Sequence, residues 1–191
     1  MEDIQSQYIG VFTSSENDVI ACNNKLPWDI PEDINFFRKL THGHIVVMGR
    51  KTFHNLGMER GLPGKINIII THKYIGGEFE TNSSVFYTSF NNLPDILEVI
   101  QEENPNKKIF IIGGPSIFQQ FEAQIDTWYI TKVKRHYLGD ITYSPTDLEK
   151  DFVKKMDVSR FYSENEECEV VISKWVRRNF VQRDTINCRC S

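Results

Sequence analysis

The stretch KIFIIGGPSIFQQF, residues 108–121, decides the fold class. It predicts a short apolar strand, a Gly-Gly turn and a helix that begins at Pro115, because proline is tolerated in a first helical turn. A continuously apolar strand that leads directly into a helix is typical of a parallel sheet with helices on both faces. We therefore expect an α/β protein.

The same alternation extends outward in both directions along the chain. Apolar, β-branched runs predict strands at Tyr8–Thr13, Ile45–Met48, Ile66–Thr71, Val85–Tyr87, Ile109–Ile112 and Thr127–Val133. Between them, helices are expected at Pro31–Thr41, Lys51–Leu56, Leu93–Glu102 and Pro115–Gln120. Two further strands, Phe152–Val158 and Glu169–Val176, flank the acidic turn ENEE and predict a C-terminal hairpin. We expect one domain over residues 1–178 and a flexible basic tail over residues 179–191.

Composition limits the classes of function. The chain has 191 residues and a net charge of −4, which does not favour a nucleic-acid partner. No apolar run approaches the ~20 residues of a membrane helix, so no membrane partner is expected. The four cysteines show neither metal-ligand spacing nor a disulfide framework, and we expect no metal. The start of the chain lacks the basic segment of a secretory signal, and these features together predict a cytoplasmic protein.

The stretch NNKLPWDIPEDINFFRKLT, residues 23–41, presents a single acid among apolar side chains. On the predicted helix, Asp33 and Phe37 lie one turn apart on one face. Asp33 is a candidate active-site carboxylate. The alternative is that Asp33 is an acid in the first helical turn that only offsets the helix macrodipole. The pattern alone leaves both interpretations open.

Two turns are candidate phosphate sites. In VVMGRKTFHNLG, residues 46–57, a strand ends at Gly49, and Arg50, Lys51 and Thr52 follow where a helix begins. Such charges are also common on solvated surfaces. The Gly-Gly turn at residues 113–114 would let the backbone approach a pyrophosphate closely, although a turn of this kind often only reverses the chain. The GxGxxG fingerprint is absent.

In this order and spacing, the blocks LPWDIPED, VVMGRKTF, LPGKINIIIT, IFIIGGPSIF and DTWYITKV…GD resemble the dihydrofolate reductase family from Tyr8 to Val176. The resemblance implies a central eight-stranded, mostly parallel sheet with an antiparallel last strand, flanked by four helices. It also implies NADPH-dependent reduction of 7,8-dihydrofolate to tetrahydrofolate, with hydride to C6 and a proton to N5.

The resemblance also implies roles for individual residues. Asp33 matches the active-site carboxylate, Thr131 its hydroxyl partner, Trp28 the holder of an ordered water, and Leu26 part of a mobile loop. The substrate-binding positions are Asp33, Ile34, Phe37, Arg38, Leu56, Leu62, Lys65 and Thr131. The cofactor-binding positions are Ile20, Gly49, Arg50, Lys51, Thr52, Thr71, His72, Gly113, Gly114, Ser116, Ile117 and Phe118. Asp140 matches the acid that pins the mobile loop, and either Val11 or Thr13 presents a backbone carbonyl to the nicotinamide.

One departure concerns the substrate. The family's arginine for the folate α-carboxylate is Lys65 here, and Arg38 on the neighbouring helix is expected to share this role. Lys65 leaves room for an alternative, a related reductase of a ribosylated pyrimidine in riboflavin synthesis. A second alternative is a non-catalytic folate- or NADPH-binding module, or the reductase half of a fused enzyme. A monomer is expected unless the chain belongs to such a fusion.

Overall fold

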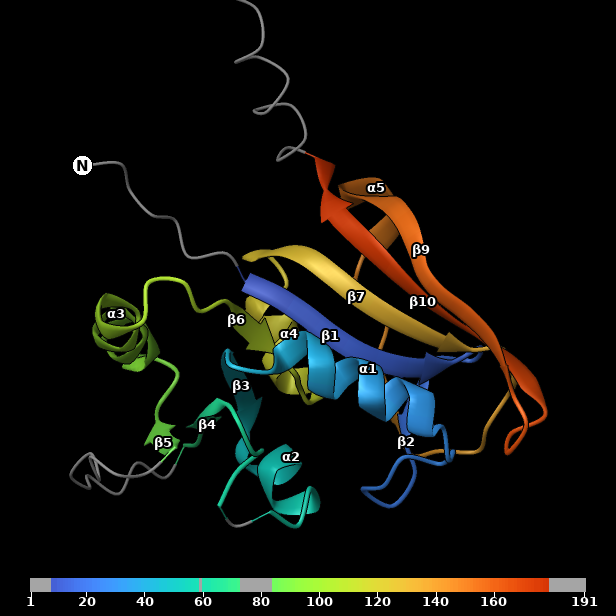
Figure 1. Ribbon diagram of the computed structural model, residues 1–191, viewed down its shortest axis with the longest axis horizontal. Coiled ribbons are helices and arrows are strands. Elements are labelled where there is room, and N and C mark those ends of the chain that lie inside the picture. Colours follow the sequence, from blue (N-terminus) through green and yellow to red (C-terminus); the bar gives the residue numbers. More distant parts are fainter. Residues whose placement is uncertain (1–7, 59, 73–83, 179–191) are drawn as a thin grey trace, which may run out of the picture.

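The computed structural model describes residues 8–58, 60–72 and 84–178 (Figure 1). Its main feature is an eight-stranded sheet with the order β5-β4-β3-β6-β1-β7-β10-β9. The strands are β1 (Tyr8–Ser15), β3 (Ile45–Gly49), β4 (Ile66–Ile70), β5 (Val85–Thr88), β6 (Ile109–Ile111), β7 (Ile125–Val133), β9 (Phe152–Ser163) and β10 (Cys168–Arg177). Only β10 runs antiparallel to its neighbours, β7 and β9. The predicted fold class and terminal hairpin are confirmed.

Helices cover both faces of the sheet because its central strands are apolar on both sides. In β3, Ile45 and Val47 pack toward α3 (Leu93–Glu103) and α4 (Pro115–Phe121). The alternate residues Val46 and Met48 face the opposite side, where α1 (Pro31–Thr41) and α2 (Arg50–Asn55) pack. Figure 1 shows α1 lying across β1. This pattern of burial is the reason why the strands lack the alternation of a half-exposed sheet.

The structure adds elements that the sequence did not predict. A small sheet pairs β2 (Val19–Ala21) with β8 (Ile141–Thr142), and α5 (Leu148–Asp151) is a fifth helix beside the four expected. Each has four residues or fewer, too few to show a hydrophobic period. Within the described residues, no helix is long and apolar enough to cross a membrane. The predicted tail, residues 179–191, lies outside them.

Candidate active site

The centre of the site is the carboxylate of Asp33, in the first turn of α1. Its side chain is buried at 7% exposure. The Thr131 hydroxyl, on β7, donates to Oδ1 at 2.7 Å, as the resemblance implied. The Thr13 hydroxyl, on β1, donates to Oδ2 at 2.6 Å, a contact that the sequence reasoning missed. Asp33 is therefore a buried acceptor held from two strands, and not an exposed acid on the surface of the helix.

The surroundings of Asp33 tune its protonation. Burial raises the pKa of this carboxyl above its ordinary value, because an apolar environment disfavours the charge. The hydroxyls of Thr13 and Thr131 lower the pKa in turn, because they donate to the ionised form. The two hydroxyls therefore help a buried acid to remain an acceptor for a ligand.

The chain before α1 places an aromatic ring beside this helix. Trp28 is buried and packs with Ile30 and Val133, and its ring meets that of Tyr137 edge to face at 5.2 Å. Its Nε1 is buried without a hydrogen-bond partner among the described residues, which leaves this N–H for an acceptor from solvent or ligand. Leu26, two residues earlier, is half exposed at 51%.

The loop that carries Leu26 is pinned at its far end. Asn23 and Asn24 both have positive φ and form the tight turn of a small hairpin closed by Cys22 and Lys25. The Asn23 amide donates to Asp140 Oδ1 at 2.9 Å, the contact that the resemblance implied for Asp140. Gly139 lets the segment that carries Asp140 pack closely against Val19, since a Cβ on residue 139 would lie 2.2 Å from the Val19 side chain.

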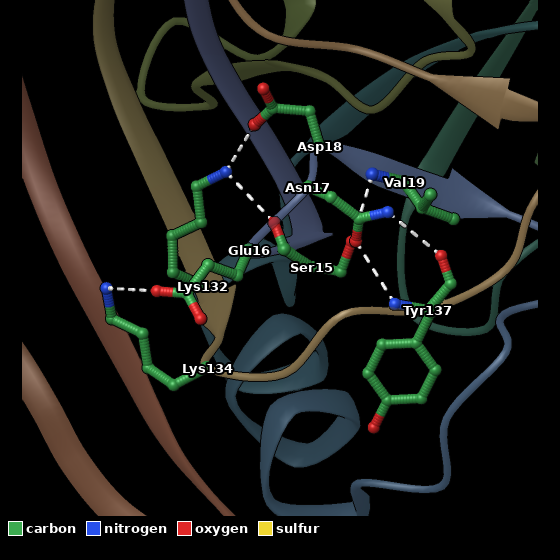
Figure 2. Close-up of polar contacts among 8 residues, drawn as sticks. All are labelled: Ser15, Glu16, Asn17, Asp18, Val19, Lys132, Lys134 and Tyr137. Carbon is green, nitrogen blue, oxygen red and sulfur yellow. Dashed lines mark hydrogen bonds and ion pairs between the residues drawn. The ribbon is translucent and has the colours of Figure 1, made fainter.

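A polar network holds the segment between β7 and β8 against the β1–β2 turn (Figure 2). The Asn17 side chain donates to the Tyr137 carbonyl at 3.0 Å and accepts from the Tyr137 amide at 3.1 Å. Lys132 contacts Asp18 and the carbonyl of Ser15. The network therefore fixes Tyr137, whose ring packs on Trp28.

The apolar positions assigned to the substrate fall into two groups. Leu62 is buried in the cluster on the α1 face, and Phe37 packs against that cluster. Ile34 and Leu56 are each 38% exposed. Large apolar side chains left partly exposed provide surface for a ring system to cover.

Lys65 and Arg38 lie close to each other. Lys65 is buried at 7% exposure, and its Nζ donates to the Pro63 carbonyl at 3.3 Å. Burial lowers the pKa of Lys65, and the nearby Arg38 lowers it further. Within the described residues, Lys65 and Arg38 are both without a carboxylate in ion-pair contact.

Asn67 holds the turn that presents Leu62 and Lys65, a role that the sequence reasoning missed. The side chain is fully buried. Its Oδ1 accepts from the Leu62 amide at 2.8 Å, and its Nδ2 donates to the carbonyls of Leu62, Lys65 and Ser84. A polar side chain inside an apolar strand, as in INIII, was the available signal.

The two candidate phosphate turns are brought together at the carboxyl ends of adjacent parallel strands. The Gly49 amide, at the end of β3, donates to the Gly113 carbonyl beyond β6 at 2.8 Å. Gly113 has a φ of +104°, and a Cβ there would lie 2.9 Å from the Phe118 ring. A Cβ on Gly114 would lie 3.3 Å from Thr52 Oγ1. A Cβ at either position would crowd a neighbouring side chain, so the close packing of this junction favours glycine.

The other residues for which the resemblance implies cofactor binding differ in exposure. Arg50, Lys51, His72 and Ser116 are exposed, whereas Thr71 is buried at the end of β4. Ile20 packs partly buried against the core. Ile117 and Phe118 are core side chains, and the Phe118 ring stacks on Tyr143 at 4.8 Å. Their amides bond to the Gly114 carbonyl, so both residues support the glycine turn.

Both halves of the site lie toward the carboxyl-terminal ends of the central parallel strands, because β1 is paired to β6 on one side and to β7 on the other. A parallel α/β sheet with these groups at the carboxyl ends of its strands is typical of an enzyme that binds a nucleotide.

Comparison with known proteins gives the family. A model of the dihydrofolate reductase family matches residues 8–177. The dihydrofolate reductase of Bacillus subtilis is 33% identical over 130 residues, which are 68% of this chain and 71% of that protein. The enzyme of Buchnera aphidicola is 34% identical over 136 residues, 71% of this chain and 76% of that protein. The chain belongs to the dihydrofolate reductase family.

A solved structure shows the same fold. Dihydrofolate reductase from Enterococcus faecalis, complexed with NADP(H) and RAB-propyl, superposes with a TM-score of 0.73 at 23% identity. The alignment covers 91% of this chain and 98% of that one. The central sheet and its helices therefore have the arrangement found in this family.

Proposed function

We propose that this protein catalyses the NADPH-dependent reduction of 7,8-dihydrofolate to 5,6,7,8-tetrahydrofolate. The observation that carries the proposal is the buried Asp33 carboxylate, held by two hydroxyls toward the carboxyl-terminal ends of the central strands, where the Gly-Gly turn also follows β6. The pterin edge offers two parallel donors, a ring N–H and an amino group. Asp33 accepts both, which fixes the ring with C6 toward the cofactor.

Protonation of N5 is separate from this contact. The carboxylate binds the far end of the pterin ring, so the proton reaches N5 through water. Trp28, with its free buried N–H, is placed to orient such a water. The loop around Leu26 excludes bulk solvent when it is closed, and the Asn23–Asp140 bond holds it in place.

The residues present fit NADPH. The Gly49–Gly113 hydrogen bond brings the start of α2, with Arg50, beside the Gly-Gly turn that leads into α4. We propose that these turns receive the pyrophosphate, and that Arg50, with Thr71 and His72, binds the 2′-phosphate. NADPH supplies the hydride; the protein supplies orientation and electrostatics.

Folate, rather than a ribosylated pyrimidine, is proposed as the substrate, because the relatives that share this sequence are named dihydrofolate reductases. Steady-state turnover with each of the two substrates tests the choice. We expect NADPH oxidation with dihydrofolate and none above background with the pyrimidine. The opposite preference would overturn the proposal.

A monomeric, cytoplasmic enzyme is also proposed. Cys22 and Cys168 are free thiols, which suits a reducing compartment. Sedimentation of the purified chain, with and without NADPH, tests the oligomeric state.

We further propose that Lys65, assisted by Arg38, binds the α-carboxylate of the folate glutamate. Three observations support this role. Lys65 lies close to Arg38, Lys65 is buried, and neither side chain forms an ion pair with a carboxylate of the described residues. The Lys65 ammonium, bonded to one carbonyl, has unused donors, and an incoming carboxylate would satisfy them.

Substitution of Lys65 tests this role. Lys65→Arg is expected to tighten dihydrofolate binding by about 1 kcal/mol, roughly fivefold, because a guanidinium can donate two parallel hydrogen bonds. Turnover should change little, since a contact remote from C6 stabilises ground and transition states alike. KM for dihydrofolate and for a pterin without the glutamate, measured in wild type, Lys65→Arg and Lys65→Ala, provides the check. Wild-type affinity for dihydrofolate in Lys65→Ala would exclude Lys65 from this role.

The pH dependence adds a second readout. Because the pKa of Lys65 is lowered, its positive charge is lost at a lower pH than that of an ordinary lysine. Dihydrofolate binding by the wild type should therefore weaken as pH rises through this lowered pKa. The Lys65→Arg variant should show no such alkaline loss, because arginine stays charged.

A further inference from the structure

The carboxylate of Asp33 is held from two strands at once. Thr13 on β1 and Thr131 on β7 are direct partners in the parallel pairing of these strands. Partners in register place their side chains on the same face of the sheet, here the face covered by α1. Each hydroxyl takes a different oxygen, Thr13 bonding Oδ2 at 2.6 Å and Thr131 bonding Oδ1 at 2.7 Å. The acid is therefore oriented by a symmetric pair of donors.

The acceptor capacity of the carboxylate explains what the second hydroxyl achieves. An ionised carboxylate has about four lone-pair sites, roughly two on each oxygen. With only Thr131 bound, the carboxylate could rotate about its terminal torsion and present its oxygens unequally. With both hydroxyls bound, each oxygen keeps one site, and the remaining sites form a pair. A pair of acceptor sites matches a ligand that presents two parallel donors.

We propose that Thr13 is a positioning residue for the pterin, acting through Asp33 by anchoring the second carboxylate oxygen. This role rests on the proposed reduction of dihydrofolate, and it adds a determinant on β1 to the acid on α1. Thr13 lies near the carboxyl end of β1 and is partly buried, so its hydroxyl is close to the site without being part of the deep core.

The protonation of Asp33 is coupled to the same contact. Burial and the hydroxyls of Thr13 and Thr131 are the causes that act on the pKa of this carboxyl; no charged side chain of the described residues is among them. Loss of the Thr13 hydroxyl removes a donor to the ionised form. The pKa of Asp33 should then rise, and the carboxyl should become protonated at a higher pH than in the wild type.

Thr13→Val and Thr13→Ser form the test pair, because valine keeps the shape of threonine without its hydroxyl, whereas serine keeps the hydroxyl. For Thr13→Val we expect KM for dihydrofolate at pH 7 to rise about tenfold, as for the loss of a hydrogen bond to a charged group. KM for NADPH should not change, and the acid limb of kcat/KM for dihydrofolate should move to higher pH. Thr13→Ser should restore both properties.

A readout independent of substrate completes the test. Carbon-13 NMR of labelled aspartate side chains, with Asp33 assigned from its loss in Asp33→Asn, reports its titration in the free protein. A higher midpoint in Thr13→Val than in wild type and Thr13→Ser supports the proposal. An unchanged midpoint and KM in Thr13→Val, or equal impairment in both variants, would overturn it. Absence of dihydrofolate reduction in the wild type, with the NMR shift present, would instead refute the proposed function.

Discussion

Asp33→Asn is expected to lower hydride transfer to dihydrofolate by about two orders of magnitude or more at pH 8, typical of removing a group that positions the reactant. The amide offers one acceptor oxygen in place of a pair, so the pterin loses its paired contact. Activity should recover partly at low pH, where N5 takes its proton from solvent. Single-turnover rates across pH provide the measurement. Near-wild-type transfer at pH 8 would remove Asp33 from the mechanism.

Folding stability serves as the control for this variant. The pKa of Asp33 is raised by burial, so the folded protein holds this proton to a higher pH than the unfolded chain does. The stability that the protonated carboxyl contributes is therefore lost as pH rises through the folded pKa. Since the substituted amide carries no charge, the free energy of unfolding of Asp33→Asn at pH 8 should equal or exceed that of wild type. If the free energy of unfolding of Asp33→Asn were lower than that of wild type, the loss of activity would be attributed to damage to the fold.

Arg50→Ala is expected to weaken NADPH binding by about tenfold while leaving NADH binding nearly unchanged, since only NADPH carries the 2′-phosphate. Arg50 is the first residue of α2 and is exposed. It follows Gly49, whose amide is bonded to the carbonyl of Gly113. Dissociation constants for both nucleotides, obtained from fluorescence titration, give the comparison. Equal weakening of the two would assign Arg50 to the pyrophosphate rather than to the 2′-phosphate.

A matched surface cation separates this effect from a change in overall charge. Lys39 is exposed in the last turn of α1 and has no assigned role in nucleotide binding. Lys39→Ala removes the same charge, and both dissociation constants should stay at their wild-type values. Weaker NADPH binding in this variant would indicate a long-range electrostatic effect.

The sequence was sufficient for strands marked by a continuous apolar run and for a helix marked by a proline at its start. The bounds of α1 match the expected Pro31–Thr41, and β3, β4 and β6 differ from expectation by one residue at one end. Continuous apolar runs and prolines at helix starts are local signals, so they predict strands and helices without knowledge of the packing.

Features that depend on contacts between distant residues were not predictable in this way. The alternation in β1 places Thr13 on the face of Val11, but neither that face nor the register with Thr131 is encoded locally. Asn67, inside β4, also donates to the carbonyl of Ser84, 17 residues away, while it holds the turn that carries Lys65. In both cases, a polar residue acquires part of its role from a partner in another segment of the chain.

The oxidation of NADPH in the presence of dihydrofolate tests the central claim most directly. Absorbance at about 340 nm, where the reduced nicotinamide absorbs, is followed after the purified protein is mixed with both compounds, and with each compound alone. We predict a steady fall that requires both compounds and the protein, and that is at least about a hundredfold slower with Asp33→Asn. No fall in absorbance with the folded wild-type protein, or an equal fall with Asp33→Asn, would contradict this prediction.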